Sequence, residues 1–181
     1  MSQALQVSRS FFQSKDEEKL EYSPHPEAPI PAGYFRSPQH SQEKNEHFFM
    51  VSPTSGFNPY PTNPPQFKQV LEEIYPYFTK LGMLVESIIN DCLDLPPNFL
   101  KEYNDDRSWD VLLALHYVPA SNTETNIGKT CHTDASSVTF VFQDGVEGLE
   151  FYGDGKWIPV VPPQGTLVIN IGDLIQVPFL T

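Results

Sequence analysis

The fold is decided by residues 129–142, which read Lys-Thr-Cys-His-Thr-Asp-Ala-Ser-Ser-Val-Thr-Phe-Val-Phe. This stretch places His132 and Asp134 two residues apart at the start of an apolar strand. In an extended chain residues i and i+2 share a face, so an imidazole nitrogen and a carboxylate oxygen can converge on one point. The pair supplies two of the three ligands of a 2-His-1-carboxylate triad, which binds non-haem Fe(II) and leaves positions open for a co-substrate and O₂.

A single His-x-Asp pair is weak evidence by itself, because most such pairs are simple surface hydrogen bonds. The sequence downstream strengthens the metal interpretation. Residues 143–152 predict a turn and then a strand, and Gly153-Asp154-Gly155 predicts a tight hairpin. Residues 156–161 and 166–171 predict two further strands. Short strands separated by Gly and Pro favour a β-sandwich or jelly roll.

Four segments in this order resemble the iron(II)/2-oxoglutarate-dependent oxygenases of the isopenicillin-N-synthase-like group. They are His-Thr-Asp at 132–134, Phe-Gln-Asp-Gly-Val-Glu-Gly-Leu at 142–149, Trp-Ile-Pro at 157–159 and Gly-Thr-Leu-Val-Ile-Asn-Ile-Gly-Asp at 165–173. The resemblance is most specific over residues 111–177, and a weaker similarity extends back to about residue 10.

The resemblance implies an α+β chain with an incomplete double-stranded β-helix (jelly-roll) core and a long N-terminal scaffold helix. It divides the chain at residue 110. Residues 1–110 are then an N-terminal helical and loop region packed on the core, and residues 111–181 are a partial Fe(II)/2-oxoglutarate oxygenase jelly-roll domain.

The same resemblance implies the site. His132 and Asp134 would be the first two iron ligands, with 2-oxoglutarate as co-substrate and a small organic molecule and O₂ as partners. Tyr117 matches the residue whose aromatic hydroxyl contacts the 2-oxoglutarate carboxylate, although it lies one place from the usual spacing and Val118 can occupy that slot. We expect His116 to be a hydrogen-bonded core residue, and Cys131 to be a packed thiol rather than a soft metal ligand.

Two further groups that the resemblance implies have no match in this sequence. The family places a second ligating His, and an Arg for the far carboxylate of 2-oxoglutarate, downstream of the Gly-Asp at 172–173. Here no His follows His132, and no Arg follows Arg107. We therefore expect the chain to be an interior piece of the fold, truncated at both ends, and inactive by itself.

Composition excludes several classes of partner. The net charge of −12 argues against nucleic acid and anionic membranes, because phosphate binding needs clustered Lys and Arg. No apolar run is long enough to cross a bilayer, and no basic-then-apolar leader is present. Two cysteines are too few for a disulfide framework. We therefore expect a cytoplasmic protein.

Upstream of the metal strand, three elements are predicted. Residues 15–20 predict a short helix with Ser14 as its N-cap, and Trp109 to Val118 predicts a strand buried on both faces. Residues 66–94 predict the scaffold helix, continuing past Pro76, and Pro96-Pro97 predicts the start of a short helix through Tyr103. The apolar stripe of the scaffold helix comprises Phe67, Val70, Leu71, Ile74, Phe78, Leu81, Val85, Ile88 and Cys92.

Three functions remain in view. The first is an oxygenase that decarboxylates 2-oxoglutarate and hydroxylates, desaturates or cyclises a small organic molecule. The second is a catalytically dead relative that acts as a binding or regulatory module, which the missing third ligand favours for the chain as written. The third, a cupin-like metal isomerase or hydrolase, predicts further His or Glu ligands on neighbouring strands, and none is well placed.

Overall fold

The computed structural model describes residues 1–38, 41–119 and 127–179. The chain divides into two compact units, Met1–His132 and Thr133–Thr181. Both helices and strands occur along it, which confirms the α+β expectation. The two units meet at His132, whereas the predicted domain boundary lies at residue 110. The domain boundary stays a prediction.

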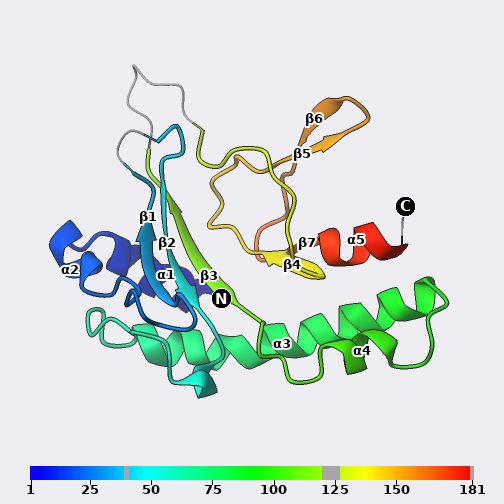
Figure 1. Cartoon of the computed structure of the whole chain (residues 1–181). Coiled ribbons are helices and arrows are strands. Elements are labelled where there is room, and N and C mark those ends of the chain that lie inside the picture. The colour runs from blue at the N-terminus through cyan, green and yellow to red at the C-terminus, as the bar shows by residue number, and fades with distance from the viewer. Residues whose placement is uncertain (39–40, 120–126, 180–181) are drawn as a thin grey trace. The chain divides into compact units, whose positions relative to one another are not determined.

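The first unit is built on a three-stranded antiparallel sheet in the order β1-β2-β3 (Figure 1). Its strands are β1 (Gly33–Arg36), β2 (Asn45–Met50) and β3 (Leu112–Tyr117). Phe48 of β2 lies opposite Tyr34 of β1 and Ala114 of β3, and all three are buried. Because side chains alternate along a strand, this register gives the sheet one apolar inner face.

Helices α1 (Ser2–Phe12) and α3 (Phe67–Cys92) supply the other half of this core. The ring of Phe11 lies 5.8 Å from that of Phe48 and 5.1 Å from that of Phe67, in edge-to-face or tilted arrangements. Aromatic pairs favour such geometries, and they fix the helices on the sheet. Helix α1 was not predicted, although Ala4, Val7 and Phe11 have the three- and four-residue spacing of a buried helical face.

The predicted short helix is α2 (Asp16–Leu20), but its N-cap is Lys15 rather than Ser14. No side chain caps this end, so the Ser14 prediction was wrong. The first turn instead carries Asp16, Glu17 and Glu18, whose negative charges favour a helix N-terminus. A one-turn 3₁₀ helix, η1 (Pro53–Ser55), lies between β2 and α3.

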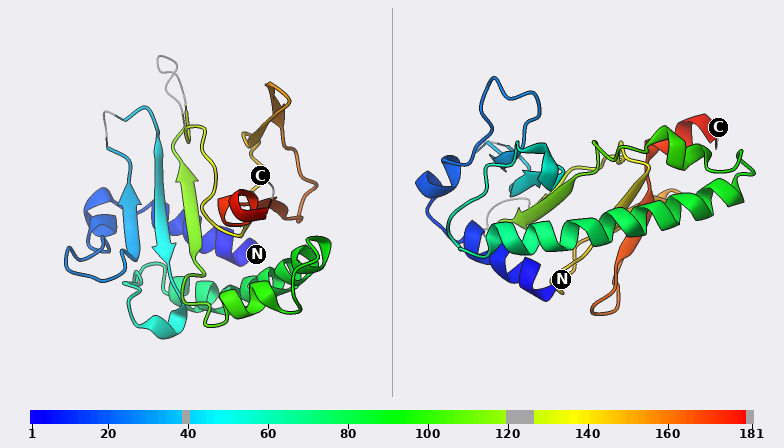
Figure 2. Two further views of the ribbon diagram at one scale, coloured as in Figure 1. Left: turned by 45° about the vertical axis from the view of Figure 1, so that its right-hand side comes forward. Right: turned by 90° about the horizontal axis from the view of Figure 1, so that it is seen from below.

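The scaffold helix α3 is confirmed and continues through Pro76, but its predicted apolar stripe holds only in the first half. Ile88 and Cys92 are exposed, whereas Glu86 and Asn90 are buried. Polar contacts explain why Asn90 is buried in place of the apolar residues of the stripe. Asn90 Oδ1 accepts a bond of 3.2 Å from the backbone N–H of Leu100, in helix α4 (Phe99–Tyr103), which lies beside the end of α3 (Figure 2).

The prediction that β3 is buried on both faces was wrong. Ala114 on the inner face is buried, but Leu115 and Tyr117 on the other face are 52% and 49% exposed. In the first unit, helices α1 and α3 cover only the inner face of the sheet, so the alternate residues of β3 have no core to enter.

The second unit contains two two-stranded antiparallel sheets. Strand β4 (Val138–Val141) pairs with β7 (Val168–Ile171), and β5 (Glu150–Gly153) pairs with β6 (Lys156–Pro159). Asp154 and Gly155 join β5 to β6 with φ angles of 51° and 76°, which is the primed turn of a two-residue hairpin. The four predicted strands are thereby found.

Helix α5 (Asp173–Phe179) follows β7 directly. Where these two elements join, Gly172 lies so close to the backbone that an added Cβ would be 2.0 Å from the carbonyl oxygen of Ser136. Across the described residues of both units, none of the helices has an apolar stretch of the length that a bilayer requires.

Candidate metal centre

The segment that leads to His132 is held against the sheet of the first unit. Ile127 forms a parallel bridge with Glu43, just before β2, and the backbone N–H of Lys44 donates to the Ile127 carbonyl over 3.2 Å. Asn45 Nδ2 donates to the carbonyl of Gly128 over 2.7 Å. Backbone and side-chain bonds thus fix this segment a few residues before the candidate ligand.

His132 is exposed, and its Nδ1 lies 2.8 Å from the backbone carbonyl oxygen of Thr130. A carbonyl oxygen only accepts, so Nδ1 donates the hydrogen and the imidazole lone pair lies on Nε2. Metal-binding histidines are commonly oriented in this way, with one ring nitrogen donating to a carbonyl and the other facing the metal. The contact therefore suits His132 to bind a cation through Nε2.

Asp134 is half-buried and belongs to the second unit. Its Oδ2 accepts a hydrogen bond of 2.8 Å from Asn170 Nδ2, on β7, and its carbonyl oxygen accepts one of 2.8 Å from the backbone N–H of Asp173. Thr133 Oγ1 also donates to Asp173 Oδ2 over 2.7 Å. These bonds orient the carboxyl group and join the start of the unit to the β7–α5 junction.

The strand argument that first linked the two residues needs correction. Residues 132–134 lie in neither strand nor helix, and β4 begins only at Val138. Strand alternation therefore does not place the two side chains. Cys131 is an exposed free thiol, so the prediction that it is packed was also wrong, because no strand face buries it.

The donor set fits Fe(II) in type, since it offers one imidazole nitrogen and one carboxylate. Within the described ranges 1–38, 41–119 and 127–179, no group of three or more His, Cys, Asp or Glu side chains is arranged to hold a metal. The described residues therefore contribute two candidate ligands, His132 and Asp134.

Tyr117 ends β3, opposite Asn45, and its ring lies against Gly128, where an added Cβ would be 2.7 Å from Tyr117 Cδ1. Partial burial raises the pKa of the phenol, against the lowering effect of Lys129, and Glu43 raises it further. Tyr117 is thus a neutral hydroxyl beside the segment that leads to His132. Its role toward 2-oxoglutarate stays a prediction.

His116 is hydrogen-bonded as predicted, because its Nδ1 lies 2.8 Å from Glu46 Oε1, but it is not a core residue, since its side chain is 40% exposed. Glu46 is buried and also accepts bonds from Lys19 Nζ, over 2.7 Å, and from the hydroxyl of Tyr34. Burial alone would raise the pKa of Glu46, but the bonds from His116, Lys19 and Tyr34 outweigh it and lower the pKa to about 2. This charged, hydrogen-bonded cluster links helix α2 to all three strands of the sheet.

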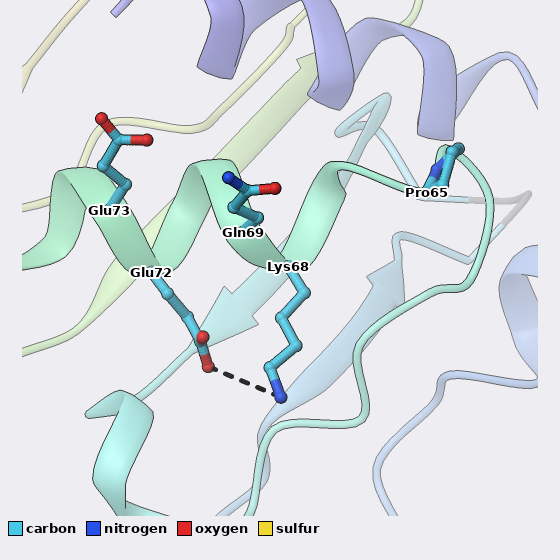
Figure 3. Close-up of a pocket in the computed structure, with 5 residues that line it drawn as sticks. All are labelled: Pro65, Lys68, Gln69, Glu72 and Glu73. Carbon is cyan, nitrogen blue, oxygen red and sulfur yellow. Dashed lines mark ion pairs between the residues drawn. The ribbon is translucent and has the colours of Figure 1, made fainter.

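A shallow hollow on the first turns of α3 has none of the predicted site residues (Figure 3). Lys68 Nζ lies 4.0 Å from Glu72 Oε1, while Gln69 and Glu73 project from another side of the helix. Because these polar groups do not converge, the hollow offers no second candidate site.

Sequence reasoning missed two residues that contact the candidate ligands or their neighbours. Asn170 donates a hydrogen bond to Asp134. Glu43 accepts a hydrogen bond from Thr130, whose carbonyl oxygen accepts one from His132. A polar Asn inside the apolar run Val-Ile-Asn-Ile was a usable signal for the first. The sequence carries no comparable signal for Glu43, because 87 residues separate it from Thr130.

Comparison with known proteins gives concordant matches in sequence and structure. The family model described as "2OG-Fe(II) oxygenase superfamily" matches residues 109–178. Flavanone 3-dioxygenase 2 of Oryza sativa subsp. japonica is 31% identical over 183 residues, covering 97% of this chain and 53% of the relative. A full-length Neurospora crassa protein, solved in complex with alpha-KG and 5-formyluracil, is 26% identical with a TM-score of 0.82, covering 97% of this chain and 58% of that one.

A third match shows the fold alone. JOX2, solved in complex with 2OG, Fe and JA, is 22% identical with a TM-score of 0.82, covering 98% of this chain and 56% of that one. These matches confirm the predicted jelly-roll core, and the structure confirms the long N-terminal helix. The Neurospora crassa structure holds alpha-KG, which is the co-substrate that the sequence resemblance implies.

The fold is shared with solved proteins that bind alpha-KG or 2OG. In sequence and in fold the chain resembles the 2OG-Fe(II) oxygenase superfamily. The chain spans about half the length of the rice relative.

Proposed function

We propose that this chain is part of a non-haem Fe(II)/2-oxoglutarate-dependent oxygenase that hydroxylates, desaturates or cyclises a small organic molecule. The observation that carries the proposal is the His132 contact, in which Nδ1 donates to the Thr130 carbonyl, an orientation that suits Nε2 to bind a cation. Asp134 would be the second ligand, binding through a carboxylate that Asn170 already orients. Iron and 2-oxoglutarate, when bound, would activate O₂, which is the oxidant.

The residues of this chain have binding and orienting roles in the proposal. His132 and Asp134 hold the metal, and the Tyr117 hydroxyl donates a hydrogen bond to a 2-oxoglutarate carboxylate. A phenol whose pKa is raised keeps its proton at neutral pH, so it can donate to an anion. The net charge of −12 supports a small-molecule substrate over nucleic acid or anionic membrane.

By itself, we propose, the 181-residue chain binds iron weakly and does not turn over. Two protein ligands leave more positions to water than a complete triad does, and each lost ligand removes a large share of metal-binding free energy. The alternative is a catalytically dead member that acts as a binding or regulatory module, which the absence of a third ligand among the described residues favours.

Anaerobic titration of the purified chain with Fe(II) and 2-oxoglutarate tests the proposal, with the weak visible charge-transfer band of the chelated complex as the readout. We expect a band that is lost in His132→Ala and in Asp134→Ala. His25→Ala is the matched control, because His25 bonds only locally to the backbone of Glu27, and it should keep the band.

A band that survives His132→Ala would overturn the site assignment. No band in the unaltered chain, at any iron concentration, would favour the regulatory module. A cytoplasmic location is a further proposal, suggested by the two free cysteines, and cell fractionation tests it.

A further inference from the structure

We propose that Glu43 is a positioning residue that fixes the imidazole of His132 through Thr130. The inference rests on the proposed function only for the identity of the metal. It concerns residues of the first unit alone, since Glu43, Thr130 and His132 all lie within Met1–His132.

Glu43 receives three hydrogen bonds from two consecutive residues. Its Oε1 accepts from the backbone N–H of Thr130 over 3.0 Å and also from the Thr130 hydroxyl, and its Oε2 accepts from Lys129 Nζ over 2.9 Å. One carboxylate thereby holds both the main chain and the side chain of Thr130. Charge-assisted bonds of this kind are roughly twice as strong as neutral ones.

The carboxylate is itself anchored to the sheet. Glu43 lies two residues before β2 and forms the bridge with Ile127, and Asn45 binds the Gly128 carbonyl. The bonds from Thr130 and Lys129 lower the pKa of Glu43 to about 2, so the group is ionised at neutral pH. Its side chain is 18% exposed, whereas that of its partner Lys129 is 47% exposed.

Thr130 transmits this restraint to the candidate ligand. With its N–H and hydroxyl held by Glu43, the backbone of Thr130 is fixed, and its carbonyl oxygen is directed at Nδ1 of His132 over 2.8 Å. That contact selects the tautomer with hydrogen on Nδ1 and the lone pair on Nε2. Residues that orient a ligating His in this way typically change metal affinity by roughly 10- to 100-fold when they are lost.

The test compares Glu43→Ala, Glu43→Gln and the unaltered chain. Nitrogen-15 NMR of the histidine side chains in metal-free protein reports the tautomer, with the His132 signals assigned from their loss in His132→Ala. We expect a defined Nδ1–H tautomer in the unaltered chain, a mixture in Glu43→Ala, and a partial return in Glu43→Gln, which keeps one acceptor oxygen. Glu73→Gln, an exposed position on α3, is the matched control and should change nothing.

Anaerobic Fe(II) titration by calorimetry gives the second readout. Glu43→Ala should weaken binding by roughly 10- to 100-fold, while Glu73→Gln leaves it unaltered. If Glu43→Ala does not fold, Thr130→Val removes the hydroxyl donor alone and should shift the tautomer in the same direction by less. An unchanged His132 tautomer in the folded variants would overturn the proposal.

The two readouts separate this inference from the proposed function. A changed tautomer in a chain that never binds Fe(II) would support the positioning role and count against the oxygenase. The opposite result is Fe(II) binding through His132 together with a His132 tautomer that does not change in Glu43→Ala. It would support the oxygenase and overturn the positioning role.

Discussion

The two units of the chain use similar apolar strands but bury them to different extents. In the first unit Phe48 and Met50 of β2 are completely inaccessible, because α1 and α3 cover the inner face of the sheet. In the second unit every residue of β6 is exposed, and Ile169 and Ile171 of β7 are about half exposed. Apolar sequence therefore predicts strands, but burial depends on whether another layer covers them.

This contrast extends to the candidate ligands. His132 ends the well-packed unit, and Asp134 begins the unit with open strands. The orienting bonds differ correspondingly, since Thr130 is tied to the first sheet by Glu43 whereas Asn170 lies on a two-stranded ribbon. We expect the histidine to be the more rigid of the two ligands.

The largest test of the contrast is truncation of one aromatic residue in each unit. Phe48→Ala should lower the free energy of unfolding by about 3–5 kcal/mol, because the cavity would lie among rings that cannot collapse into it. Trp157→Ala, on the exposed hairpin, should cost much less. Urea unfolding measures both, and equal losses would show that the second unit is as well packed as the first.

Acid should destabilise the first unit through Glu46. Its folded pKa of about 2 lies below the ordinary 4.5, so its contribution is complete above pH 4.5 and is lost as the pH falls toward 2. The shift corresponds to about 3 kcal/mol. Thermal unfolding at several pH values measures this loss. In Glu46→Gln the acid-induced loss of stability should be smaller but still present, because Glu43 titrates over the same range. A pH profile identical to that of the unaltered chain would show that Glu46 does not cause this loss.

Within the second unit, the β7–α5 junction should be its most sensitive point. An alanine Cβ at Gly172 would lie 2.0 Å from the Ser136 carbonyl oxygen and 2.7 Å from that of Asp134, and backbone cannot give way cheaply. Gly172→Ala should cost about 1–3 kcal/mol and increase amide exchange in β4 and β7. Gly153→Ala is the control, because its Cβ would lie 3.9 Å from Ile158. Equal exchange in both variants would contradict the close approach.

The smallest expected effect concerns the hairpin turn. Gly155 has φ of +76° and nothing within 4 Å of an added Cβ, so Gly155→Ala should cost only the backbone strain, about 1 kcal/mol. An increase in amide exchange that is limited to β5 and β6 would show this local loss of stability. An exchange increase that spreads into β4 and β7 would mean that the two ribbons unfold together.

Local features of the fold were predictable from sequence. The β5–β6 hairpin follows from Asp154-Gly155, because two consecutive residues that tolerate positive φ specify a primed turn. The first half of α3 follows from the spacing of Phe67, Val70 and Leu71. The second half does not, since Glu86 is buried by its ion pair with Arg107, 21 residues away, which no periodicity reports.

The candidate site was predictable only where its residues are neighbours in the chain. The His132 and Asp134 motif is local, so the sequence supplied it. The residues that orient the pair are distant: 87 residues separate Glu43 from Thr130, and 36 separate Asn170 from Asp134. Their contacts depend on sheet register, and register is set by the whole fold.

The main chain of Lys44 has a consequence for how this protein can vary. Its carbonyl oxygen accepts from the N–H of Val118 over 2.9 Å, and its N–H donates to the Ile127 carbonyl over 3.2 Å. A single residue therefore fastens both ends of the interval from 119 to 126. Insertions and deletions between Val118 and Ile127 should therefore be tolerated more readily than changes next to the candidate ligands His132 and Asp134.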